Sequence, residues 1–213
     1  MRYYIADCHF FHEALNREMD HRGFASVEEM NEYMIKRWNE KVRNRDEVVI
    51  LGDLSMGNAE QTNALLDRLQ GRLFLIVGNH DNRYLRSKTF HKERFGWIYP
   101  YAELHDDGRK VVLSHYPIAC YNGQYLKNKK GEPRTYMLYG HVHDSHDERL
   151  IEQYQQMVEK TRIPDRNGET QSLSSHMINC FCMYSDYQPL SLDEWISLTE
   201  QRLIRCQNVE DSL

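Results

Sequence analysis

Short apolar runs rich in β-branched and aromatic residues recur along this chain and alternate with amphipathic stretches of helical period. The five clearest runs cover residues 3–6, 48–51, 73–77, 111–113 and 136–139. Such alternation is typical of an α/β layer architecture, in which strands and helices follow one another along the chain. A sixth run, residues 177–184, predicts a late strand.

Helices are expected between these runs. Two Ser-x-x-Glu patterns, Ser26 with Glu29 and Ser191 with Glu194, predict capping boxes at helix starts. The chain has 213 residues and contains no internal repeat, low-complexity tract or obvious linker. A chain of this length can bury a sizeable core by itself, so we expect one domain over residues 1–213.

Metal-binding types of side chain stand directly after each of the five clear runs. The clusters are Asp7-Cys8-His9, Gly52-Asp53, Gly78-Asn79-His80-Asp81, Ser114-His115 and Gly140-His141-Val142-His143. Open α/β sheets place their ligand sites at the carboxyl ends of their strands. Glycine precedes three of the clusters, and it permits the tight turn and close backbone approach that let a side chain fold back onto an ion.

The ligand types predict the kind of ion. Two carboxylates, one amide oxygen and four imidazoles suit Mn²⁺, Fe²⁺ or Zn²⁺ better than Ca²⁺, which prefers oxygen ligands. Mg²⁺ fits this nitrogen-rich set less well. Seven candidate ligands exceed what one tetrahedral ion uses, whereas two divalent ions that share a bridging carboxylate would use all of them.

The ordered set of motifs resembles the calcineurin-like metallophosphoesterases, in particular their small bacterial and phage members. The motifs that carry the resemblance are Asp7-x-His9, Gly52-Asp53, Gly78-Asn79-His80-Asp81, His115 and Gly140-His141-x-His143, within residues 3–195. The resemblance implies an α/β fold of four layers. Two packed mixed β-sheets would form a sandwich flanked by helices, with a dinuclear metal site at the carboxyl ends of the strands.

The resemblance also implies a role for each residue of the motifs. One ion would be held by Asp7, His9, Asp53 and His143, and the other by Asp53, Asn79, His115 and His141. Asp53 would bridge the two ions, and Asn79 would also border the substrate. His80 would face the phosphate as a general acid or charge stabiliser, with Asp81 behind it to orient its imidazole.

The implied reaction is hydrolysis of a phosphate ester, a phosphodiester in preference to a monoester, by attack of a hydroxide that the metal ions activate. His80 would supply the proton that the leaving alkoxide needs. His12 either approaches the substrate or packs within the fold, and the sequence leaves both roles open. The alternative function is a metal-binding interaction scaffold of the same fold with little turnover.

Composition narrows the compartment and the class of partner. The formal net charge of −5, without interleaved basic and aromatic residues, argues against dedicated nucleic-acid binding. No run approaches about 18 apolar residues, so we expect no transmembrane helix. The five cysteines, an odd number without framework spacing, predict a cytoplasmic protein; they are Cys8, Cys120, Cys180, Cys182 and Cys206. Alternation along a strand places Cys180 and Cys182 on one face, where we expect them to pack in the core.

Overall fold

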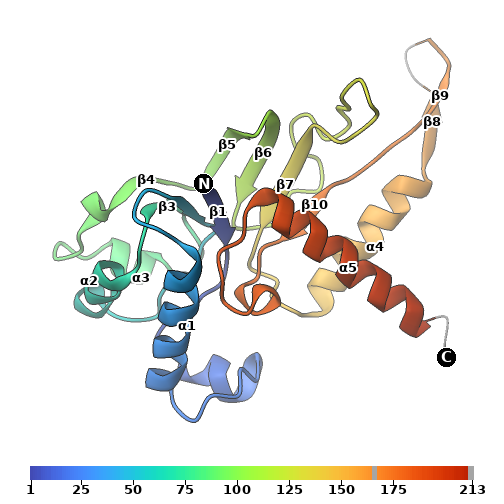
Figure 1. Cartoon of the computed structure of the whole chain (residues 1–213). Coiled ribbons are helices and arrows are strands. Elements are labelled where there is room, and N and C mark those ends of the chain that lie inside the picture. The colour runs from blue at the N-terminus through green and yellow to red at the C-terminus, as the bar shows by residue number, and fades with distance from the viewer. Residues whose placement is uncertain (165–166, 211–213) are drawn as a thin grey trace.

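The computed structural model of the chain describes residues 1–164 and 167–210, with side chains through residue 204. Two four-stranded sheets pack against each other, and helices lie on the sides of the pair (Figure 1). Side chains from both sheets, among them Tyr4, Val49, Val111 and Leu138, form one buried cluster between them. The expected four-layer α/β sandwich is therefore confirmed.

The first sheet is wholly parallel. Its strands run in the order β1 (Arg2–Ile5), β2 (Glu47–Ile50), β3 (Arg72–Ile76) and β4 (Phe95–Tyr99). Its other face packs against the apolar sides of α1 (Val27–Lys41) and α2 (Ala59–Arg68). Because all four strands point the same way, their carboxyl ends meet at one edge of the sheet.

The second sheet is mixed. Its strands run in the order β10 (Met177–Asn179), β7 (Thr135–Tyr139), β6 (Arg109–Ser114) and β5 (Tyr101–Asp106), and only β5 is antiparallel to its neighbour. Helix α4 (His146–Lys160) packs on its outer face. Helix α5 (Leu192–Glu210) contributes Trp195, whose indole Nε1 donates to the backbone oxygen of Tyr4 at 2.9 Å.

The remaining elements are short. They are α3 (Asn82–Leu85), the hairpin β8 (Arg162–Pro164) and β9 (Thr170–Ser172), a π-helical turn (Leu15–Met19) and two 3₁₀ turns (Lys92–Arg94 and Cys182–Ser185). No helix within the described residues is both long and apolar enough to cross a bilayer.

Two strands of the four-stranded sheets, β4 and β5, were not predicted from the sequence, and neither was the short β8–β9 hairpin. β5 is half exposed along its length and carries polar residues such as Glu103, His105 and Asp106, so it lacks an apolar run. β4 contains Gly96, whose missing side chain makes room for the ring of Phe74. Both strands depend on pairing with a neighbour rather than on local propensity.

The predicted late strand is shorter than expected, and the placement of its cysteines is wrong. β10 ends at Asn179, whose side-chain Oδ1 accepts from the amide of Phe181, and a 3₁₀ turn begins at Cys182. Cys180 therefore packs between the sheets, whereas Cys182 packs in the cluster on the helix side of the first sheet. Both are buried in the core, but on different faces. The side chain of Cys206 lies outside those described.

The predicted caps are found with one difference. Ser26 accepts from the amide of Glu29, but the Glu29 carboxylate turns to the amide of Ala25 rather than that of Ser26. At the last helix, Ser191 and Glu194 exchange both hydrogen bonds of a capping box.

Candidate metal centre

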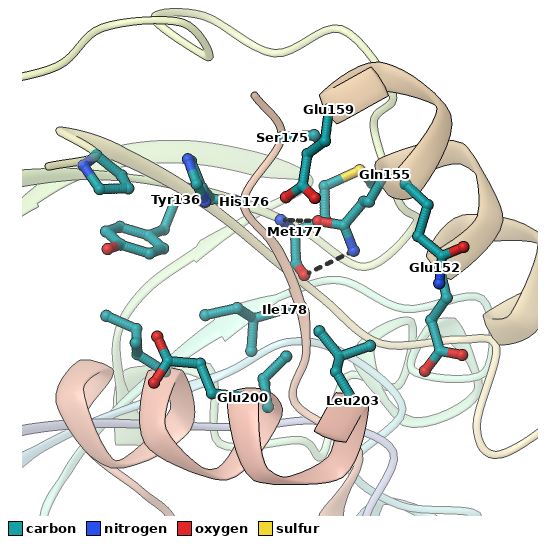
Figure 2. A pocket seen from close by; sticks show the side chains of 14 residues that line it. Tyr136, Glu152, Gln155, Glu159, Ser175, His176, Met177, Ile178, Glu200 and Leu203 are labelled. Atoms are coloured by element: carbon teal, nitrogen blue, oxygen red, sulfur yellow. Dashed lines mark hydrogen bonds between the residues drawn. The ribbon is translucent and has the colours of Figure 1, made fainter. Parts of the chain in front are cut away.

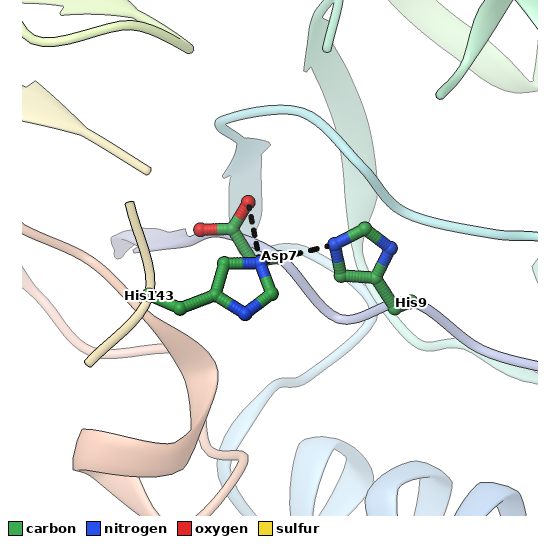
Figure 3. Close-up of side chains that lie close together, drawn as sticks. All are labelled: Asp7, His9 and His143. Carbon is green, nitrogen blue, oxygen red and sulfur yellow. Dashed lines mark hydrogen bonds and ion pairs between the residues drawn. The ribbon is translucent and has the colours of Figure 1, made fainter. Parts of the chain in front are cut away.

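The loops that follow β1, β2, β3, β6 and β7 converge where the carboxyl ends of the two sheets meet. They bring together all seven side chains that were predicted as ligands. The first group contains Asp7, His9 and His143, whose donor atoms lie within 4.8 Å of one another. The Nε2 atoms of His9 and His143 are 3.2 Å apart, and Asp7 Oδ1 is 3.9 Å from His143 Nε2 (Figure 3).

A second group lies beside the first. It contains His115, Asn79 and His141, in which Asn79 Oδ1 is 2.9 Å from His115 Nε2 and 2.9 Å from His141 Nδ1. Asp7 and Asp53 also lie within 4.8 Å of a ring nitrogen of His115. Three side chains from the loops after β3, β6 and β7 thus point their donor atoms at one another.

Asp53 stands between the two groups. Its Oδ2 is 3.5 Å from His9 Nε2 in the first group and 3.5 Å from His115 Nε2 in the second. A carboxylate oxygen equidistant from ligands of both groups has the position that a bridging ligand requires.

The donor set fits divalent ions. Donor atoms about 2.1 Å from one ion are separated by about 3.0 Å in octahedral and about 3.4 Å in tetrahedral geometry. The separations of 2.9, 3.2 and 3.5 Å in the two groups fall in or next to this range. The facing Nε2 atoms of His9 and His143 point to the same conclusion, because one shared ion accommodates both lone pairs.

The backbone at the site is held in an uncommon conformation. Positive φ angles occur at Asp7, His9, Asp53, His141 and His143, between 48° and 72°. Non-glycine residues adopt this region rarely, and surrounding structure has to hold them there. Five of the seven candidate ligands are therefore aimed by a left-handed turn after a strand.

The glycines that precede the clusters provide the close approach expected of them. A Cβ on Gly140 would lie 2.5 Å from Asp7 Oδ2, and a Cβ on Gly78 or Gly52 would overlap Asp53 or His115. Only Gly52 also needs glycine for its backbone, at φ +90°.

Electrostatics couple the groups when no ion is bound. Burial raises the pKa of Asp7 to about 6, against the charges of His143 and His115. Burial opposes the charged form of His115, yet its hydrogen bond to Asp53 and the charges of Asp7 and Asp53 raise the pKa of His115 to about 9. Despite burial, contact with His115 lowers the pKa of Asp53 to about 2. Without an ion, His115 of the second group and Asp53 therefore form an imidazolium–carboxylate pair.

His80 lies next to Asp53 but belongs to neither donor group. Its Nε2 is 4.0 Å from Asp53 Oδ2, its side chain is 43% exposed, and its amide donates to Asp53 Oδ1 at 2.8 Å. His12 lies beside His9, with ring centroids 5.6 Å apart. Its Nδ1 accepts from the amide of Leu15 at 3.3 Å, so its proton sits on Nε2.

Asp81 does not orient His80, and that expectation is wrong. Its two oxygens accept from the amides of Asp53, Leu54 and Gly78 and from the hydroxyl of Tyr84, at 2.7–2.9 Å. Asp81 is fully buried and joins the loop after β2 to the loop after β3. It is a positioning residue for Asp53.

Asp20 and Arg22 also belong to the site, although neither was predicted from the sequence. Asp20 Oδ1 accepts from His143 Nδ1 at 2.8 Å, which leaves Nε2 free to bind an ion. Arg22 donates to Asp20 Oδ2 and to the backbone oxygens of Asp7 and Cys8. No sequence motif marks these two residues. The only signal in the sequence was an acidic residue and an arginine two positions apart, in a segment without a predicted helix or strand.

A separate cavity of about 340 Å³ lies between α4, α5 and the second sheet (Figure 2). Gln155 and Met177 line this cavity. The side-chain amide of Gln155 donates to the backbone oxygen of Met177 and accepts from its backbone N–H. None of the predicted site residues lines this cavity.

Comparison with known proteins agrees with this geometry. A family model described as calcineurin-like phosphoesterase matches residues 3–196. The chain is 32% identical over 209 residues to "Uncharacterized protein MJ1445" of Methanocaldococcus jannaschii, covering 97% of this chain and 96% of that protein. It is 29% identical over 167 residues to "Gene 66 protein" of Mycobacterium phage L5, covering 66% of this chain and 76% of the relative.

A solved structure shows the same fold. The crystal structure of protein AQ665 of unknown function from Aquifex aeolicus superposes with a TM-score of 0.62 at 23% identity, over 91% of this chain and 96% of that chain. With nearly the whole chain matched by one family model and a candidate Asp/His metal centre at its sheet edge, this protein belongs to the calcineurin-like phosphoesterase family.

Proposed function

We propose that this chain is a single-domain, dinuclear metal-dependent phosphohydrolase that favours phosphodiesters over phosphomonoesters. One observation carries the proposal, the position of Asp53 Oδ2 at 3.5 Å from a histidine of each donor group. In this proposal Asp7, His9, Asp53 and His143 hold one ion, and Asp53, Asn79, His115 and His141 hold the other.

When bound, two divalent ions supply an activated water as the nucleophile and offset the negative charge on the phosphoryl oxygens. The nitrogen-rich donor set favours Mn²⁺, Fe²⁺ or Zn²⁺ over Mg²⁺. Free cysteines at Cys8, Cys120, Cys180 and Cys182 suit a cytoplasmic location.

Two further histidines act on the substrate. His80 is exposed above Asp53, where its ring can give a proton to the leaving oxygen, which an alkoxide leaving group needs. Because His80 can supply this proton, we expect the protein to act on diesters whose leaving group is a poor one. His12 donates its Nε2–H to a phosphoryl oxygen, because Leu15 occupies its other nitrogen. The side-chain amide of Asn79, which would hold the second ion, also borders the substrate.

The test combines metal content with turnover. Wild type loaded with Mn²⁺ is expected to hold two ions per chain and to hydrolyse bis(p-nitrophenyl) phosphate faster than, or as fast as, p-nitrophenyl phosphate. Asp53→Asn is expected to lose more metal than His9→Ala or His115→Ala, because Asp53 serves both ions.

Three results contradict the proposal. Full activity with one tightly held ion would exclude the dinuclear model. Turnover of monoesters alone across Mn²⁺, Zn²⁺ and Mg²⁺ would exclude the diesterase preference. Two bound ions with no turnover of either reporter would favour the interaction scaffold instead.

A further inference from the structure

The segment that follows His80 is strongly basic. Residues 82–92 contain four Lys or Arg residues and no Asp or Glu, in a chain whose formal net charge is −5. The four are Arg83, Arg86, Lys88 and Lys92, and all are exposed. The positive charge is therefore local and begins next to the metal centre.

Local geometry places two of these cations on one side of a helical turn. The backbone is right-handed helical from Asp81 through Arg86, around α3. Tyr84 and Leu85 are buried, which turns Arg83 and Arg86 outward together. Residues three apart on such a turn have Cβ atoms about 5–6 Å apart, so the two guanidinium groups can act on one ligand.

The helical turn that carries Arg83 and Arg86 begins beside the metal centre, at His80. In a helical turn each Cα–Cβ bond tilts toward the amino end, and the amino end of α3 is where His80 lies. The amide of Arg83 donates to the backbone oxygen of His80 at 3.1 Å, which fixes the turn directly against that residue. Arg86 lies about 4.5 Å farther along the axis than Arg83.

Neither arginine is neutralised by the protein. Within the described part of the chain, neither Arg83 nor Arg86 has a carboxylate within ion-pair distance, whereas Arg2, Arg37 and Arg68 do. A guanidinium group presents a planar set of donors that matches two oxygens of a phosphate. Two such groups outside the reacting centre suit an anion other than the phosphate being hydrolysed.

We propose that Arg83 and Arg86 bind a second phosphate group of the substrate, so that the preferred substrate is a phosphate ester carrying another phosphate nearby. This inference rests on the proposed function, because it takes the metal centre as the place where the first phosphate binds. The net acidity of the rest of the molecule favours a small two-phosphate ester over a long strand.

The test uses two substrates that differ by one phosphate. Thymidine 5′-(p-nitrophenyl phosphate) and its 3′-phosphorylated form release the same nitrophenolate. Wild type is expected to give a higher kcat/KM with the 3′-phosphorylated form. In Arg83→Ala and Arg86→Ala this preference is expected to shrink about 10- to 150-fold each, the effect of removing one charged hydrogen-bond donor. Arg83→Glu is expected to reverse it.

Arg45→Ala is the matched control. Arg45 is an exposed arginine in the turn before β2, at the amino end of the first sheet and away from the metal centre. It is expected to keep the wild-type preference. Equal preference in wild type for both substrates, or the same loss in Arg45→Ala as in Arg83→Ala, would overturn the inference.

Binding separates this inference from the proposed function. Calorimetry of the metal-loaded protein is expected to show tighter binding of thymidine 3′,5′-bisphosphate than of thymidine 5′-monophosphate, and the difference is expected to fall in Arg83→Ala. If the bisphosphate binds more tightly but no substrate is hydrolysed, the proposed hydrolase activity is contradicted and the second phosphate site is supported. If the two nucleotides bind equally, the second phosphate site is contradicted. A further rise in affinity with an oligothymidylate of eight residues would identify the source of the second phosphate as a strand, and no further rise would identify it as a small molecule.

Discussion

At the scale of single residues, His80 can be separated from the ligands that surround it. Replacing His80 by Asn is expected to leave both ions bound, because His80 belongs to neither donor group. The variant's kcat is expected to fall about 10²- to 10⁴-fold on alkyl esters, the usual effect of losing a general acid. Metal analysis together with rates on alkyl and nitrophenyl esters checks this.

The loss should shrink for nitrophenyl esters, since a nitrophenolate leaves without a proton. Asn79→Ala is the neighbouring comparison, because it should lose metal and recover some activity in excess Mn²⁺. If His80→Asn loses metal, or keeps its rate on alkyl esters, His80 is a ligand or a bystander.

Asp20 is expected to strengthen the binding of one ion, the one that His143 would hold, and to leave the affinity for the other unchanged. Its hydrogen bond sets which nitrogen of His143 carries the proton, and removing such a partner typically costs 10- to 100-fold in metal affinity. Asp20→Ala is therefore expected to weaken one of two Mn²⁺ binding steps by about that factor, measured by calorimetry.

Asp193→Asn serves as the control for Asp20. Asp193 is an exposed carboxylate that pairs with Arg109 at the start of α5, far along the chain from the metal loops. Equal weakening of both steps in Asp20→Ala, or the same weakening in Asp193→Asn, would show that Asp20 acts through general stability or charge.

At the scale of elements, the loops after β2 and β3 act as one unit because Asp81 ties them together. Asp81→Asn would leave an amide group facing backbone N–H donors at Asp53, Leu54 or Gly78. Each buried donor left without an acceptor costs about 1–3 kcal/mol. The free energy of unfolding is therefore expected to fall by about 2–4 kcal/mol in urea denaturation, with weaker metal retention.

Asn82→Ala is the control, since Asn82 is the next residue and its side chain is exposed. The opposite result would be an Asp81→Asn variant that is stable and keeps its metal but hydrolyses alkyl esters as slowly as His80→Asn. It would show that Asp81 orients the imidazole of His80 after all.

At the scale of the whole molecule, Glu148 links helix α4 to the second sheet. It is buried and accepts from the hydroxyl of Tyr139 at 2.8 Å and from the amide of Asn179 at 3.0 Å. Asn179 in turn donates to the backbone oxygen of His143. Burial raises the pKa of Glu148 from 4.5 to about 7, despite the hydrogen bond from Tyr139.

This shift predicts a pH dependence of stability. The folded protein holds the Glu148 proton more tightly than the unfolded chain, so this contribution to stability is complete below pH 4.5 and is lost as the pH rises to about 7. Across this window, wild type is expected to lose about 1–3 kcal/mol relative to Glu148→Gln, at 1.36 kcal/mol per pKa unit. Urea denaturation of both proteins from pH 5 to 8 measures the difference. A parallel pH profile in the two proteins would contradict the assignment.

The sequence alone was sufficient where information is local. Apolar runs, capping serines and the residues just past each strand follow from nearest neighbours, and parallel strands bring their ends together whatever the details. That is why the seven candidate ligands from Asp7 to His143 and an α/β layer architecture could be named in advance, whereas the four-layer arrangement was expected only from the resemblance to a known family.

Tertiary structure alone decided what depends on residues far apart in the chain. Asp20 meets His143 across 123 positions, and Asp81 turns to the loop after β2 instead of to the adjacent His80. Cys180 and Cys182 separate onto two faces because β10 ends at Asn179. A buried hydrogen-bonding group takes whichever partner the packed chain brings within reach, and short-range periodicity carries no record of that choice.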